Sequence, residues 1–135
     1  MNEPTPSAPR LPGYWNQLLR LAQDEVRATL DELPPLLRER AAQVPVVYEP
    51  RPSADLVRDG IEADTLGLFI GEAYPDSASG AIQLPAQVIL YLDNLWDFAE
   101  GDEEIFCEEV STTLMHELGH YLGLDEDDLE ERGLD

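Results

Sequence analysis

Several residue types are scarce in this sequence of 135 residues, and each shortage excludes a class of protein. Cys107 is the only cysteine, so no disulfide can form within one chain and nothing indicates an oxidising compartment. No apolar run approaches the length of a membrane span. The Pro-rich N-terminus also lacks the apolar segment of a cleaved signal peptide, which favours a cytoplasmic protein.

Basic residues are also scarce. The sequence has 8 Lys and Arg residues against 29 Asp and Glu residues, which gives a formal net charge of −21. Nucleic acid and anionic membrane surfaces are therefore not expected as partners, because both require a cationic protein face. Metal cations and basic peptide segments suit such a charge, although the same charge also serves solubility.

The length and the composition indicate one globular domain. Hydrophobic residues make up 43% of the sequence, and a chain of this length can bury a core without disulfides. Residues 1–13 contain four prolines and a glycine, which predicts a flexible N-terminal arm. We therefore expect a single domain over residues 14–135.

Two long helices are predicted from the spacing of apolar residues. Between Tyr14 and Leu33 these residues recur at three- and four-residue steps, which is typical of an amphipathic helix. Pro34 ends this helix, and a short second helix is expected over residues 36–42. The last helix is expected over residues 103–124, with Asp102 as its N-cap. Its expected apolar side consists of Ile105, Phe106, Val110, Thr113, Leu114 and Leu118.

Three short segments are predicted to be strands, at residues 44–49, 66–73 and 87–92. Residues 51–64 are predicted to form a loop with one helical turn, and residues 94–100 a short helix. The elements together predict an α+β fold.

The sequence His116-Glu117-Leu118-Gly119-His120 carries the chemistry. Residues four apart lie on one face of a helix, so both imidazoles can reach one metal ion, and imidazole is a good zinc ligand. Glu117 lies one step round the helix, where it can take a proton from a water molecule that the metal activates. His116 and His120 are the only histidines in the sequence, which argues against an accidental pairing.

A catalytic zinc usually has three protein ligands, so one more is needed from elsewhere. The run from His116 to Glu126 resembles the extended pattern H-E-x-x-H-x-x-G-x-x-H, with Glu126 in place of the last histidine. Gly123 allows the chain to turn back, and a carboxylate is an acceptable zinc ligand. Glu126 is therefore the predicted third ligand, with Asp125 and Asp127 as alternatives.

With these residues the chain resembles the small bacterial zincin-like metallopeptidases, in which the extended motif ends in an acidic residue. The order of the segments at 30–34, 66–69 and 87–95 supports the resemblance more weakly. The resemblance implies a minimal zincin-like fold, with a small mixed sheet packed against an N-terminal helix and a C-terminal metal-binding helix. It also implies a Zn²⁺ cofactor and peptidase activity.

The expected function is therefore hydrolysis of peptide bonds in a peptide or protein substrate, with Glu117 as the general base. Zincins commonly bind peptide along a sheet edge, for which residues 66–73 and 87–92 are candidates, although the second segment is better explained as a core strand. The alternative is a non-catalytic zinc-binding interaction module on the same scaffold. The oligomeric state does not follow from the sequence.

Overall fold

A computed structural model of the chain describes residues 12–71 and 86–122. The helices there are α1 (Pro12–Asp31), α2 (Pro35–Ala41), α3 (Ala54–Arg58), α4 (Leu92–Phe98) and α5 (Glu103–Leu122). The strands are β1 (Val46–Glu49), β2 (Gly67–Ile70) and β3 (Gln87–Tyr91). The architecture is mixed α+β, as the sequence predicts. Within these ranges, no helix combines the length and apolar character that crossing a membrane requires.

β3 is the central strand of a mixed sheet with the order β1-β3-β2. It runs parallel to β1, with Val46 opposite Val88, and antiparallel to β2, with Gly67 opposite Leu90. Four of its five residues are buried, which explains why it is also the most apolar of the strands. The interpretation of residues 87–92 as a core strand is thus confirmed, and β2 lies at an edge of the described sheet.

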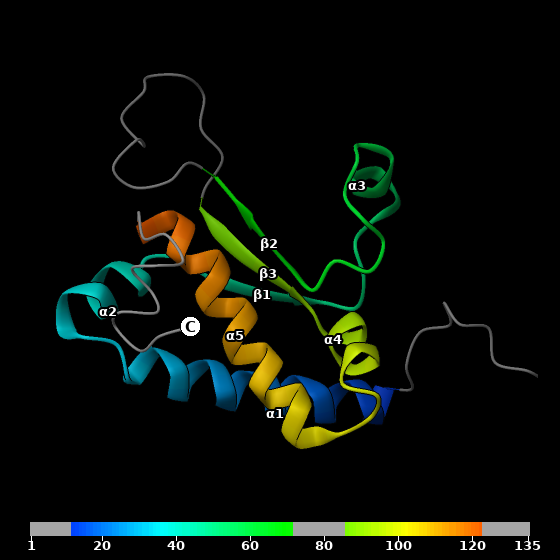
Figure 1. The fold of residues 1–135 in the computed structure, drawn as a ribbon, viewed down its shortest axis with the longest axis horizontal. Helices are drawn as coiled ribbons and strands as arrows, with labels where there is room; N and C mark the ends of the chain where they lie inside the picture. The colour runs from blue at the N-terminus through cyan, green and yellow to red at the C-terminus, as the bar shows by residue number, and fades with distance from the viewer. Residues whose placement is uncertain (1–11, 72–85, 123–135) are drawn as a thin grey trace, which may run out of the picture.

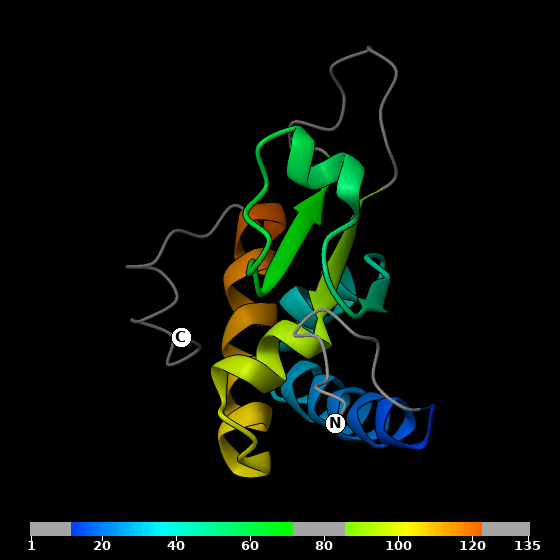
Figure 2. The ribbon, with the colours of Figure 1, turned by 90° about the vertical axis from the view of Figure 1, so that its right-hand side faces the viewer.

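The long helices pack against one face of this sheet and against each other. α5 crosses the front of the sheet in Figure 1, and the perpendicular view in Figure 2 places it beside the same face, with α1 running below. A hydrogen bond of 2.9 Å from the Thr29 hydroxyl to the Ser111 hydroxyl joins α1 to α5. The N-terminal and C-terminal helices therefore share one layer.

The core is built from helical stripes that repeat every four residues. On α5 the stripe consists of Phe106, Val110, Leu114 and Leu118, each no more than 1% exposed. On α1 it consists of Leu18, Ala22 and Val26. The prediction of the apolar side of α5 is wrong at one position, because the side chain of Ile105 is 42% exposed. Ile105 lies one residue before Phe106, and one residue corresponds to about 100° of rotation in an α-helix.

Most element boundaries differ from the expected ones by about two residues, as is usual for helix and strand ends. α1 begins at Pro12 rather than at residue 14, and proline is well tolerated in the first turn of a helix. α4 begins directly after β3, two residues before the expected start. The expected flexible arm now overlaps α1 at its last two residues, and residues 1–11 lie outside the described ranges.

β2 and α5 approach each other closely at Gly67. A Cβ atom at this position would lie 2.5 Å from Cγ2 of Thr113 on α5 and 3.2 Å from the backbone oxygen of Ile89. Only a residue without a side chain fits between the edge strand and the helix here. The distance between β2 and the middle of α5 therefore depends on glycine at position 67.

Substitution of Gly67 by alanine should lower the free energy of unfolding by about 1–3 kcal/mol, because overpacking forces neighbouring atoms apart. Thr113→Ser removes the Cγ2 methyl group, so the double variant Gly67→Ala/Thr113→Ser should recover much of the loss. Urea denaturation of both single variants and the double variant gives the coupling energy. Strictly additive effects would contradict this contact.

Candidate metal centre

The two histidines and Glu117 lie on the last turns of α5, as the motif requires. The helix is fixed at its start by Asp102, whose Oδ1 accepts a hydrogen bond of 3.0 Å from the backbone N–H of Ile105. The predicted N-cap is thereby confirmed. From there the helix runs without interruption to Leu122, so His116 and His120 are four residues apart on one helix face.

The burial pattern shows that His116 and Glu117 of the motif face away from the core. Met115 and Leu118 are buried, whereas His116 is exposed and Glu117 is half-buried. The imidazole of His116 is therefore accessible from outside, next to a carboxylate that is partly shielded from water. The side chain of His120 lies outside the described part of the structure.

His116 and Glu117 line a pocket between α5 and the beginning of β2. Its volume is about 360 Å³, at the lower end of the range of about 300–1,000 Å³ that is typical of ligand sites. The lining residues are Thr65, Leu66, Gly67, Glu109, Thr112, Thr113, His116 and Glu117. One wall is thus a helix face and the other is the start of an edge strand.

Three residues of α5 line this pocket ahead of the motif and were not predicted as site residues from the sequence. Glu109, Thr112 and Thr113 stand seven, four and three positions before His116, so they share its face of α5. Helical periodicity alone identifies this face. The opposite wall comes from Thr65, Leu66 and Gly67, about fifty positions earlier in the chain. Leu66 and Gly67 belong to the segment 66–73, which the sequence predicts as a candidate peptide-binding edge.

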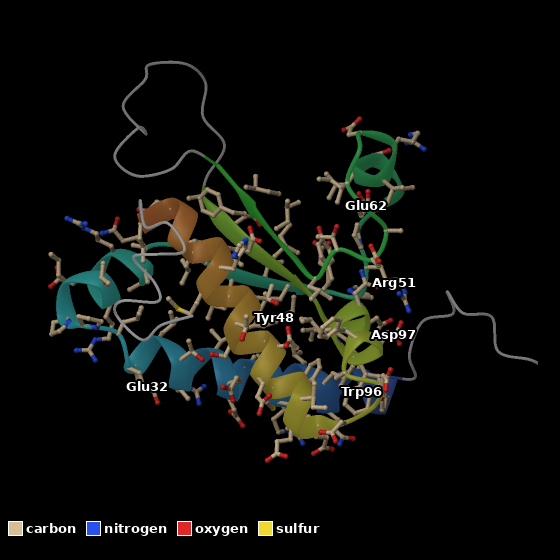
Figure 3. All side chains as sticks on the ribbon, in the orientation of Figure 1. Glu32, Tyr48, Arg51, Glu62, Trp96 and Asp97 are labelled. Carbon is tan, nitrogen blue, oxygen red and sulfur yellow. The ribbon has the colours of Figure 1, made fainter. Side chains whose placement is uncertain are left out.

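Asn94, which was predicted only as the start of a short helix, fixes that opposite wall. Its side chain is buried, and Nδ2 donates hydrogen bonds of 2.8 Å and 2.9 Å to the backbone oxygens of Ala63 and Thr65. Oδ1 accepts a hydrogen bond of 2.5 Å from Arg51, which also pairs with Asp97 at 3.0 Å. Figure 3 shows Arg51 and Asp97 beside α4. The network ties the segment before β2 to the start of α4.

The candidates for a third ligand, Glu126, Asp125 and Asp127, lie outside the described residues. Among residues 12–71 and 86–122, no three His, Cys, Asp or Glu side chains are grouped so that they could hold a metal ion. The donor set nevertheless fits zinc as far as the structure describes it. It offers an accessible imidazole on the pocket wall and a second histidine one turn further along the helix.

Cys107 belongs to another part of the surface. It is half-buried in a groove between α1 and α5, together with Glu25 and Glu103. Burial raises the pKa of its thiol above the ordinary value, and the carboxylates of Glu25 and Glu103 raise this pKa further. The Cys107 side chain therefore lines the groove between the two long helices and not the pocket that contains the motif.

The chain is similar to one family of known proteins. The model of a family described as zincin-like metallopeptidase matches residues 41–134, which is more than half of the chain and includes the whole extended motif. A comparison with curated proteins gives no match.

Replacement of Asn94 by alanine should lower the free energy of unfolding by about 1–3 kcal/mol, because the backbone oxygens of Ala63 and Thr65 lose their buried partner. The loss should be accompanied by faster amide exchange in residues 63–67, measured by hydrogen–deuterium exchange. Asp97→Asn is the matched control, since it changes the exposed end of the same network. Equal exchange in residues 63–67 of the Asn94 variant and the wild type would contradict the assigned role.

Proposed function

The chain belongs to the zincin-like metallopeptidase family, and on this premise we propose that it is a zinc-dependent peptidase with Glu117 as its general base. One observation carries the proposal. A single pocket brings together an accessible imidazole, a half-buried carboxylate and the start of an edge strand. These are the parts that peptide hydrolysis requires, namely a metal ligand, a proton acceptor and a surface for an extended chain.

The zinc ligands in this proposal are His116, His120 and one carboxylate of the acidic segment after Gly123, with Glu126 as the first choice over Asp125 and Asp127. Imidazole and carboxylate are both common zinc donors. When bound, zinc would polarise the substrate carbonyl and acidify a water molecule.

Glu117 transfers the proton in this proposal. Its carboxylate takes a proton from the attacking water and passes it to the amine that leaves, so one group serves as base and then as acid. Its position one step round the helix from His116 keeps it next to the ligands rather than among them. Partial burial also suits this role, because a carboxylate shielded from water interacts more strongly with nearby charges.

β2 is the element that would hold the substrate backbone. Among the described strands it pairs only with β3, so its other edge is available for a further strand. A peptide in extended conformation can add to this edge through backbone hydrogen bonds. Thr65, Gly67 and Glu117 line the same pocket, which supports a peptide position within reach of the Glu117 carboxylate.

A second candidate function is a zinc-binding interaction module without catalysis. The observation that favours it is the modest size of the pocket, about 360 Å³, which leaves little wall to enclose a substrate. Such a module would use the same histidines to stabilise the fold. Metal binding alone does not separate the two functions, but the role of Glu117 does.

Purified wild-type protein should contain about one zinc ion per chain, and the His116→Ala variant should contain far less, because one of three ligands is removed. Inductively coupled plasma mass spectrometry gives the metal content, and far-UV circular dichroism confirms that the variant remains folded. A folded wild-type protein that takes up no zinc after incubation with the ion would refute the metal site.

Glu117→Gln should retain zinc but lose peptide hydrolysis by a factor of about 10² to 10⁴, because general base catalysis contributes on this order. Cleavage of a quenched fluorescent peptide library measures the activity. Glu108→Gln is the matched control, because Glu108 is exposed and lines the other groove of α5. Loss of the metal in the Glu117 variant would instead make Glu117 a ligand, and full activity would exclude it as the base.

A further inference from the structure

The pocket continues along α5 well beyond the motif and reaches Glu109. Seven residues separate Glu109 from His116, which corresponds to about two turns or about 10 Å along the helix axis. Because α5 is continuous between them, both residues belong to one wall of one pocket. A long substrate side chain could therefore reach from the neighbourhood of His116 to the carboxylate of Glu109.

Glu109 is the only charged residue among the described residues that line the pocket away from the motif. The others are Thr65, Leu66, Gly67, Thr112 and Thr113, and no arginine is among them. Glu109 is also half-buried, in contrast to its exposed neighbour Glu108. A partly shielded carboxylate among uncharged side chains at this end of the pocket favours a cation as its partner.

The rest of the pocket suits the stem of a basic side chain. The methyl groups of Thr112, Thr113 and Leu66 offer apolar contacts, and Arg and Lys side chains commonly lay their methylene groups against apolar surface while the charged end finds a polar partner. The pocket can therefore contact the methylene groups of an Arg or Lys side chain near the motif and pair with its positive charge at Glu109.

We propose that Glu109 is a specificity-determining residue, which selects substrates with Arg or Lys at a position flanking the scissile bond. This proposal depends on the proposed peptidase function. Alternate residues of an extended peptide on the edge of β2 point toward α5, and one of them enters the pocket. Its positive end pairs with the Glu109 carboxylate while the adjacent peptide bond lies beside Glu117.

The net charge of −21 attracts any cationic peptide, so the test has to separate this general attraction from a local contact. Glu108→Gln changes the net charge as much as Glu109→Gln does. Glu108, however, lines the groove with Cys107 on the other side of the helix. A preference that depends on Glu109 alone is therefore local.

The experiment uses a set of peptides that differ only at the two positions flanking the cleaved bond, with Arg, Lys, Gln or Glu there. The ratio of kcat/KM values is measured for the zinc-loaded wild type, Glu109→Gln, Glu109→Arg and Glu108→Gln. The wild type should prefer Arg over Gln at one position by about fivefold or more. This preference should disappear in Glu109→Gln, turn toward Glu in Glu109→Arg, and persist in Glu108→Gln.

Two results would overturn the proposal: no preference in the wild type, or the same preference in Glu109→Gln as in the wild type. If the wild type cleaves none of the peptides, the peptidase function fails first. Fluorescence anisotropy then measures binding of the same peptides to Glu117→Gln and to the Glu117→Gln/Glu109→Gln double variant. Tighter binding of Arg peptides that is lost in the double variant retains Glu109 as a recognition residue, and equal binding rejects it.

Discussion

The burial of one stripe on α5 determines how the whole site is arranged. Phe106, Val110, Leu114 and Leu118 are fully buried against α1 and the sheet, so the helix cannot rotate about its axis without exposing them. Burial of one such side chain contributes about 1.5–3 kcal/mol, and together they outweigh any preference of the polar residues for another orientation. His116 lies two residues after Leu114, about 200° round the helix, and for this reason it faces outward.

The opposite wall of the pocket depends on two contacts that are distant in sequence. Gly67 allows β2 to approach α5 at Thr113, and Asn94 holds the backbone of residues 63–65 that leads into β2. The first contact sets how near the strand lies to the helix, and the second sets where the strand begins. The width of the pocket is therefore controlled by the absence of a side chain at Gly67 and by the buried amide of Asn94, neither of which lies on α5.

Features that depend on residues close together in the sequence are predicted well, whereas contacts between distant residues are not. The Asp102 cap, the four-residue stripe of α5 and the apolar β3 follow from neighbours within a few positions, and the structure confirms them. Asn94 gave no comparable signal, because its partners at Ala63 and Thr65 lie about thirty residues away. Ile105 is an error of a different kind, since hydrophobicity alone does not show on which side of the stripe a residue of the first turn falls.

The periodicity of α5 also divides its acidic residues between two surfaces. Glu108 and Glu109 are adjacent in sequence but differ by about 100° round the helix, so one lines the groove with α1 and the other lines the pocket with β2. Composition cannot distinguish them, because both add the same charge to the same segment. Only the buried stripe between these faces assigns one carboxylate to the α1 groove and the other to the wall that carries His116 and Glu117. A single helix thus supplies the proposed histidine ligands, the proposed base and the Glu109 carboxylate, provided that its packing fixes one rotation about its axis.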